Sequence, residues 1–195
     1  MKYDLSKKPT RGAQRTLDDF SRTMFDLIAE KSFDEINVNE ICKISNYPRA
    51  TFYNYFDDKF DLLNYCWYVL SSEIKLEEFQ NLPTEQLLTI YFDRIYSLLS
   101  DEKGRLDKTL RNNGINGQVV NSLKSYLQKQ MREIFYVCIE THPHPLQDHV
   151  PIELLSDHYS NTLILILEWV FFKQNQIGKT EAHQYLMYLL KNTSL

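Results

Sequence analysis

Apolar residues recur at spacings of three and four over much of the chain, which is the pattern of amphipathic α-helices. A first helix is predicted from Thr16 to Glu30, with its apolar stripe at Leu17, Phe20, Met24, Leu27 and Ile28. Ser, Asp and Asn residues favour turns in the connection that follows, although Phe33, Ile36 and Val38 still supply apolar side chains. The chain is therefore expected to change direction there without leaving the core.

A second, short helix is predicted to begin at Asn37. This residue stands three positions before Glu40. At that spacing the Asn37 side chain can accept the backbone N–H of Glu40, and the Glu40 side chain can accept the backbone N–H of Asn37. Ile41 and Ile44, together with Cys42, are expected to face inward.

The sequence Ser-Asn-Tyr-Pro at residues 45–48 is expected to end that helix and to begin another. Asn46 tolerates the left-handed backbone conformation that a tight turn requires, and Pro48 suits the first turn of the next helix. Two short helices joined by a turn of three or four residues form a helix-turn-helix.

The helix predicted from Pro48 to Phe56 carries side chains suited to reading DNA. Phe52 and Phe56 are four residues apart and can anchor it to the core. Its other faces are left to Arg49, Ala50, Thr51, Tyr53, Asn54 and Tyr55. Such residues offer the donors and small apolar groups that base edges and phosphates require in a major groove. An aromatic pair at this spacing is equally typical of plain core packing, so the pattern alone leaves both interpretations open.

Residues 37–59 resemble the DNA-binding motif of the TetR/AcrR family of transcriptional regulators. The resemblance is strongest in the stretch Ala-Thr-Phe-Tyr-x-Tyr-Phe-x-x-Lys at residues 50–59, and at motif level it extends from Arg11 to about Leu70. It implies base contacts for Arg49, Ala50 and Thr51, phosphate contacts for Tyr53, Tyr55 and Lys59, and a contact of either kind for Asn54.

Two residues depart from the family pattern in the turn. Asn46 stands where Gly is usual, and Pro48 stands where a capping Ser is common, which makes the operator sequence harder to predict. Outside the motif, Lys43 and the basic arm of Lys7, Lys8 and Arg11 are either further phosphate contacts or simply solvated.

The rest of the chain is predicted to be helical as well. Asp57 and Asp58 can cap a long connecting helix whose apolar residues are Phe60, Leu63, Trp67 and Leu70. Further helices are predicted at about 84–99, 105–112, 117–140, 152–173 and 180–190, with a turn-rich break at 112–117. The expected fold is all-α with about nine helices. A three-helix helix-turn-helix head occupies residues 1–56, and a bundle for ligand sensing and dimerisation occupies residues 57–195, beginning with the connecting helix at residue 57.

The run from Leu163 to Phe172 is apolar nearly all round except at Glu168, so both faces of its helix must be covered. A small monomer cannot easily cover both faces. This helix and the last one, paired with their copies about a two-fold axis, would form a four-helix dimer interface. The resemblance implies the same mode of dimerisation.

Aromatic residues of the bundle are the candidates for an effector pocket, although core packing is the commoner role for such residues. The candidates are Trp67, Tyr91, Tyr96, Tyr126 and Trp169. Glu168 is added because it is a carboxylate among apolar residues. It is expected to be paired with Lys or Arg, to face solvent at an interface edge, or to be a polar anchor in the pocket, in that order.

Charge is distributed unevenly along the chain. Residues 1–22 contain six basic and three acidic residues, a net charge of +3, while the whole chain carries −4. A basic arm on an acidic body suits a protein that touches phosphate with one end only, although an ordinary solvated terminus explains it equally well.

Cysteine usage and hydropathy point to a soluble cytoplasmic protein. Cys42, Cys66 and Cys138 are widely spaced in apolar helical patterns and are predicted to be reduced core thiols. No stretch approaches the roughly 18 to 20 apolar residues of a membrane span, and residues 1–10 are too polar for a signal peptide.

A histidine-rich loop at residues 142–149 raises the question of a metal. His142, His144 and His149, with Cys138 and His158 near them in sequence, offer side chains that zinc prefers. No pair has the spacing of four residues that would preform a site on one helix, and the Pro and polar neighbours are typical of an exposed loop. No metal or cofactor is therefore expected.

Together these features predict a homodimeric transcriptional regulator that binds a palindromic double-stranded DNA operator. The resemblance implies a repressor released by a small-molecule effector, and no residue decides against activation. The alternatives are a regulator of the same fold controlled by a protein partner, and a metal-responsive regulator. An enzyme is not expected, because the sequence contains no nucleophile–base pairing, Gly-rich phosphate loop or metal motif.

Overall fold

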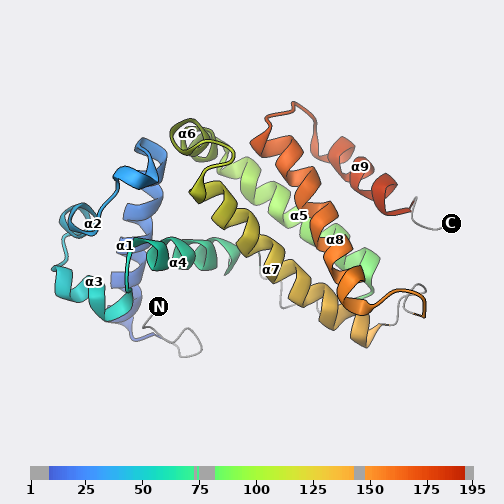
Figure 1. Ribbon diagram of the computed structural model, residues 1–195, viewed down its shortest axis with the longest axis horizontal. Helices are drawn as coiled ribbons and strands as arrows, with labels where there is room; N and C mark the ends of the chain where they lie inside the picture. The colour runs from blue at the N-terminus through green and yellow to red at the C-terminus, as the bar shows by residue number, and fades with distance from the viewer. Residues whose placement is uncertain (1–8, 73, 75–81, 143–147, 192–195) are drawn as a thin grey trace. The chain divides into compact units, whose positions relative to one another are not determined.

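The computed structural model describes residues 9–72, 74, 82–142 and 148–191, and within them the fold is all-α, as predicted (Figure 1). These residues form nine α-helices and no strand. The helices are α1 (Arg11–Glu30), α2 (Val38–Ser45), α3 (Arg49–Tyr55), α4 (Lys59–Ser72), α5 (Thr84–Asp101), α6 (Lys103–Asn113), α7 (Gln118–Thr141), α8 (Ile152–Leu167) and α9 (Lys179–Lys191). A 3₁₀ turn, η1 (Phe33–Glu35), and a π-helical turn, η3 (Glu168–Phe172), complete them. No helix of these residues is long and apolar enough to cross a membrane.

The chain divides into two compact units. The first unit comprises Met1–Ser71 and Arg105–Leu123, and the second comprises Ser72–Gly104 and Lys124–Leu195. The first unit therefore takes in most of α4 and α6 in addition to the helix-turn-helix. The functional division at residues 56 and 57 remains a prediction.

The core of the first unit is built around Phe20 of α1. Its ring lies 5.4 Å from Phe52 and 6.1 Å from Phe56, in both cases nearly edge-on. All three side chains are fully buried, which confirms that Phe52 and Phe56 anchor α3. Edge-to-face aromatic pairs add a stabilising contribution beyond the area they bury.

The prediction that Ile44 faces the core is wrong, because its side chain is 56% exposed. Helix α2 has eight residues and buries Ile41 and Cys42. At about 100° per residue, Ile44 lies about 110° away from the midpoint of those two positions. A helix of two turns that packs through one side leaves this position in solvent.

The end of α6 is also part of the first unit. Asn113 Nδ2 donates to the carbonyl of Ile28 at 2.8 Å, and Asn113 Oδ1 accepts the N–H of Phe33 at 2.7 Å. Its neighbour Asn112 donates to the carbonyl of Ala29 at 2.8 Å. The two side chains thus bind the last turn of α1 and the start of η1, which have free backbone groups to satisfy.

In the second unit, α5, the second part of α7, and α8 share an aromatic core. The ring of Phe135 lies 6.0 Å from Tyr91 and 5.6 Å from Tyr159. Helix α9 packs against α8 and α5 (Figure 1). Its residues Ala182 and Leu186 are fully buried.

Candidate nucleic-acid interface

The turn between α2 and α3 is built as the sequence predicts. Asn46 has left-handed backbone angles, φ 59° and ψ 39°, and ends α2. The N–H of Tyr47 then donates to the carbonyl of Cys42 at 3.0 Å. Pro48 is the N-cap of α3, one position before the first helical turn in which it was predicted, and its carbonyl accepts the N–H of Thr51 at 2.9 Å. The turn needs no glycine, because Asn tolerates this conformation better than most residues.

Helix α3 presents a polar face to solvent opposite its buried phenylalanine. Phe52 is fully buried, whereas Arg49, Ala50, Tyr53 and Asn54 are exposed. Thr51 and Tyr55 are half-buried at the borders of that face. The structure therefore brings together on one short helix six of the eight side chains predicted to contact DNA.

Arg49 and Tyr53 form a pair on the exposed face of α3. Arg49 Nη2 donates to the Tyr53 hydroxyl at 3.1 Å, and the guanidinium carbon Cζ of Arg49 lies 5.6 Å from the centre of the Tyr53 ring. A guanidinium held over an aromatic ring loses less freedom when it binds a ligand. Behind this face, burial raises the pKa of the Cys42 thiol, and the positive charge of Arg49 opposes that effect in part.

Tyr47 ties the turn to α1, a role that the sequence analysis missed. Its hydroxyl donates to Asp19 Oδ2 at 3.0 Å, and its ring lies 5.2 Å from Phe20. The turn before α3 is thereby fixed to the middle of α1. No local sequence signal could have shown this contact, because Asp19 and Tyr47 are 28 residues apart.

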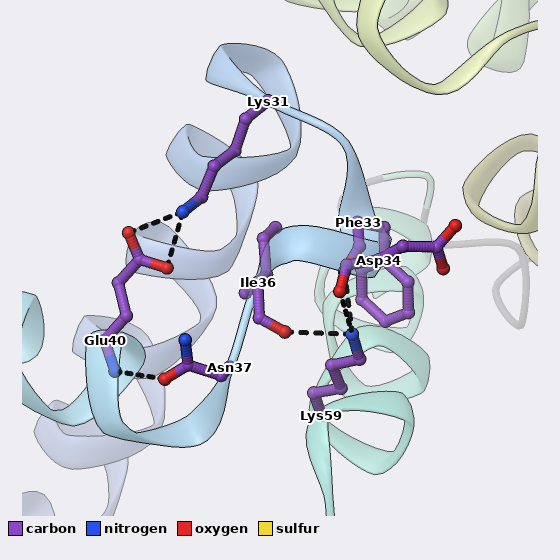
Figure 2. Close-up of polar contacts among 7 residues, drawn as sticks. All are labelled: Lys31, Phe33, Asp34, Ile36, Asn37, Glu40 and Lys59. Atoms are coloured by element: carbon purple, nitrogen blue, oxygen red, sulfur yellow. Dashed lines mark hydrogen bonds and ion pairs between the residues drawn. The ribbon is translucent and has the colours of Figure 1, made fainter.

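Lys59 begins α4, but its ammonium points back to η1 (Figure 2). Its Nζ donates to the carbonyls of Phe33 at 2.8 Å, Ile36 at 2.9 Å and Asp34 at 3.3 Å. It also lies 4.6 Å from the centre of the Phe33 ring. All three ammonium protons thus have an acceptor within the protein, whereas the family resemblance implies a phosphate contact for this residue.

Figure 2 also shows how α2 begins. Asn37 Oδ1 accepts the N–H of Glu40 at 3.1 Å, which confirms Asn37 as the cap. The reciprocal contact predicted for Glu40 is wrong. Its carboxylate instead accepts two hydrogen bonds from Lys31 Nζ, each at 2.7 Å, because an ammonium at the end of α1 is a better partner than a neutral backbone N–H.

The other basic candidates are placed only in part. Lys43 is exposed on α2 and Arg11 is exposed at the start of α1. Lys7 and Lys8 lie outside the residues that the structure describes.

Residues 25–66 match the sequence model described as "Bacterial regulatory proteins, tetR family". This region of the chain is similar to the tetR family. The match contains α2, the turn and α3, and it confirms the resemblance carried by residues 37–59. No curated protein matches the sequence.

Solved structures share the TetR-family fold over nearly the whole chain. A structure from Syntrophomonas wolfei described as a TetR-family transcriptional regulator has a TM-score of 0.63 at 18% identity, over 90% of this chain and 93% of its own. FadR of Bacillus halodurans, a fatty acid degradation regulator, has a TM-score of 0.63 at 18% identity, over 94% and 97%. DhaS, a dihydroxyacetone kinase operon activator, has a TM-score of 0.59 at 16% identity, over 91% and 95%. At such identities the likeness shows the fold alone.

The six residues predicted to line an effector pocket of this TetR-family fold are not gathered in one unit. Trp67 is buried in the first unit, where its Nε1 donates to Ser122 Oγ at 2.9 Å. The other five belong to the second unit, where Tyr91 is buried in α5 and Tyr126 is half-buried on α7. The shared pocket therefore remains a prediction.

Tyr96 lines a depression in the second unit. The depression has a volume of about 300 Å³ and is formed by Tyr96, Ser100, Lys103 and residues of η3 and the loop after it. The Tyr96 hydroxyl donates to the carbonyl of Ile177 at 3.1 Å, and burial raises its pKa. Trp169 lies at the surface, with its ring 6.0 Å from Tyr185.

Glu168 is paired with lysines, which confirms the first of the three alternatives predicted for it. Its carboxylate lies 3.5 Å from Lys124 Nζ and 3.6 Å from Lys173 Nζ. It begins η3, where the N–H of Lys173 donates to the Glu168 carbonyl five residues earlier. Such π turns are rare and disrupt the regular ladder of an α-helix.

No group of three or more His, Cys, Asp or Glu side chains that could hold a metal is found among the described residues. His144 of the histidine-rich loop lies outside them, and His142 Nδ1 is 3.1 Å from Thr141 Oγ1. All three cysteines are buried and free, which confirms the predicted core thiols.

Proposed function

We propose that this protein is a transcriptional regulator that binds a specific sequence of double-stranded DNA through α3. The observation that carries the proposal is the division of α3 into a buried Phe52 and an exposed face of Arg49, Ala50, Tyr53 and Asn54. A helix that enters a major groove requires such an exposed face with polar side chains, held in place by a buried anchor such as Phe52.

Within this proposal, each exposed side chain has a role given by its chemistry and by the family pattern. Arg49, Ala50 and Thr51, at the start of α3, contact base edges. Tyr53 and Tyr55 donate to phosphates, and Asn54 contacts a base or a phosphate. Lys43 on α2 is a phosphate contact, and Lys59 contacts phosphate only by giving up a carbonyl acceptor.

The proposed active species is a homodimer formed through α8 and α9. Both helices expose large apolar side chains, among them Leu165 at 50% and Tyr188 at 65%. A second copy related by a two-fold axis would cover this surface and place two α3 helices on one duplex. The operator is then a palindrome whose half-sites lie about one helical turn, or a multiple of it, apart.

The proposed signal is a small molecule that binds the second unit and releases the regulator, a repressor, from its operator. Repression is the expectation from the family, while DhaS, with the same fold, is described as an operon activator. A protein partner in place of the small molecule is the alternative. Action on DNA implies a cytoplasmic protein in a bacterium.

The test is selection of duplexes by the full-length protein from a random pool, followed by affinity measurements on the selected sequence. The Arg49→Ala variant should bind it more weakly by about 1–3 kcal/mol and lose discrimination at one base position. Arg111→Ala is the matched control, because Arg111 is an exposed arginine on α6 of the same unit. Failure of the wild-type protein to enrich any sequence would exclude the proposal.

A further inference from the structure

Three arginines lie along one side of α1, in the same unit as the helix-turn-helix. Arg11, Arg15 and Arg22 are four and seven residues apart, so they share one side of the helix. Together with Gln14, Asp18 and Asp19 they line an open depression of about 470 Å³. All six residues belong to α1, and we call this surface the arginine face.

The two carboxylates of the arginine face are already engaged. Asp18 Oδ1 accepts a hydrogen bond from Gln14 Nε2 at 2.7 Å. Asp19 accepts the Tyr47 hydroxyl at 3.0 Å and pairs with Arg22 at 3.6 Å. Arg11 and Arg15 are exposed, and no ion pair joins either one to another residue within the described part of the chain. Among the described residues, no carboxylate therefore neutralises the positive charges of Arg11 and Arg15.

Arg11 is not placed where it would stabilise α1. The N-terminal end of a helix carries a partial positive charge, which disfavours a cation in the first turn. Helix α1 begins with Arg11 and has no acidic residue in its first turn. Helix stability therefore does not account for an arginine at this position.

The arginine face borders the start of α3. Tyr47, whose hydroxyl donates a hydrogen bond to Asp19 of this face, is the second residue before Arg49. From Asp19 back to Arg11 the helix rises over eight residues, about 12 Å, which is about the width of the major groove. A helix lying in a groove has a phosphate backbone on either side, so an element that extends this far beside α3 would meet phosphates.

We propose that the arginine face binds backbone phosphates of the duplex that α3 reads, an inference that rests on DNA binding by α3. Guanidinium groups suit this task, because their paired N–H donors match two phosphate oxygens at once. These contacts carry no sequence information; they raise affinity and fix the register of α3 on the duplex.

The experiment measures affinity for the selected duplex between 50 and 300 mM salt, using full-length wild-type protein and the double variant Arg11→Ala, Arg15→Ala. Because each neutralised phosphate releases counterions, the slope of log affinity against log salt should become shallower by about 2 in the variant. The loss should be equal on a scrambled duplex. Arg11→Lys with Arg15→Lys should keep most of the slope, and the thermal midpoint of the alanine variant should not fall.

The matched control is Lys108→Ala with Arg111→Ala, which removes the same charge from exposed positions of α6 in the same unit. Its salt slope should equal that of the wild type. An unchanged slope in the Arg11, Arg15 variant, with the wild type still binding its duplex, overturns the inference and leaves DNA reading by α3 intact. An equal loss of slope in the α6 control also overturns it, because net charge alone would then explain the effect. A wild type that binds no duplex overturns both proposals.

Discussion

Lys59 is held by the protein itself before any DNA is present. Its ammonium donates to the carbonyls of Phe33, Asp34 and Ile36, and these three groups belong to a segment that ends before the helix-turn-helix begins. The side chain therefore fastens the start of α4 to η1. A phosphate would have to displace at least one of these carbonyls, which limits what a direct contact can add to affinity.

The variant Lys59→Met tests this structural role, because Met keeps the length of the side chain and removes the three donors. The free energy of unfolding, measured with urea, should fall by about 1–3 kcal/mol, since hydrogen-bond acceptors at partly buried positions lose a charged donor. Lys43→Met, at an exposed position on α2, should stay within about 0.5 kcal/mol of the wild type. Unchanged stability of Lys59→Met, with a salt slope of DNA binding shallower by about 1, would identify a plain phosphate contact instead.

At the residue scale, the sequence predicted what depends on neighbours in the chain. Asn37 as a cap, Asn46 in the left-handed turn, and Phe52 as an anchor all follow from local backbone preferences or from helical spacing. The ammonium of Lys59 reaches carbonyls 23 to 26 residues away, and Tyr47 reaches Asp19 over 28 residues. Such contacts depend on how helices pack, and spacing along the chain does not encode them.

At the scale of elements, Asn113, the last residue of α6, joins three elements of the first unit. Asn113 donates from Nδ2 to the carbonyls of Ile28 at 2.8 Å and Thr109 at 3.2 Å, and accepts the N–H of Phe33 at 2.7 Å. One amide thus closes the end of α6, the end of α1 and the start of η1. From sequence alone, residues 112–117 were predicted only as a turn-rich break.

Asn113→Ala should destabilise the first unit, because it leaves the N–H of Phe33 and the carbonyl of Ile28 without these partners. We expect the free energy of unfolding to fall by about 1–3 kcal/mol. It is measured by urea denaturation in a Trp169→Phe background, in which the buried Trp67 is the single fluorescent tryptophan. Asn112→Ala removes a single hydrogen bond from an exposed residue and should cost less. Equal effects of the two substitutions would contradict the central role given to Asn113.

Helix ends were harder to predict than helix existence. Helix α1 starts at Arg11, five residues before the predicted start, because Thr10 caps it where no apolar stripe is present. The helix predicted over 152–173 changes to a π turn at Glu168. The sequence did not predict this change, because an apolar run does not show whether backbone hydrogen bonds span four or five residues. The bend after it has a positive φ of 55° at Gln174 and not at Gly178.

At the scale of the whole molecule, the proposed dimer rests on the exposed apolar surface of the second unit. Leu154, Leu165 and Trp169 lie along α8 and η3, and Tyr185, Tyr188 and Leu189 lie along α9. Leu154 and Leu165 are eleven residues, or three turns, apart and so share one side of α8. Large apolar side chains gathered on two neighbouring helices are typical of an interface, whereas scattered ones are not.

Leu165→Glu should convert the proposed dimer into a monomer, because a carboxylate at the two-fold interface would be buried without a partner. Sedimentation velocity at micromolar concentration would show the change in mass, and affinity for the full palindrome should fall to that for a half-site. Val137→Glu is the matched control, since it places the same charge at an exposed apolar residue of α7, outside α8 and α9. A wild type that sediments as a monomer, or a Leu165→Glu variant that remains a dimer, would show that this surface does not pair the subunits and that the palindromic operator needs another explanation.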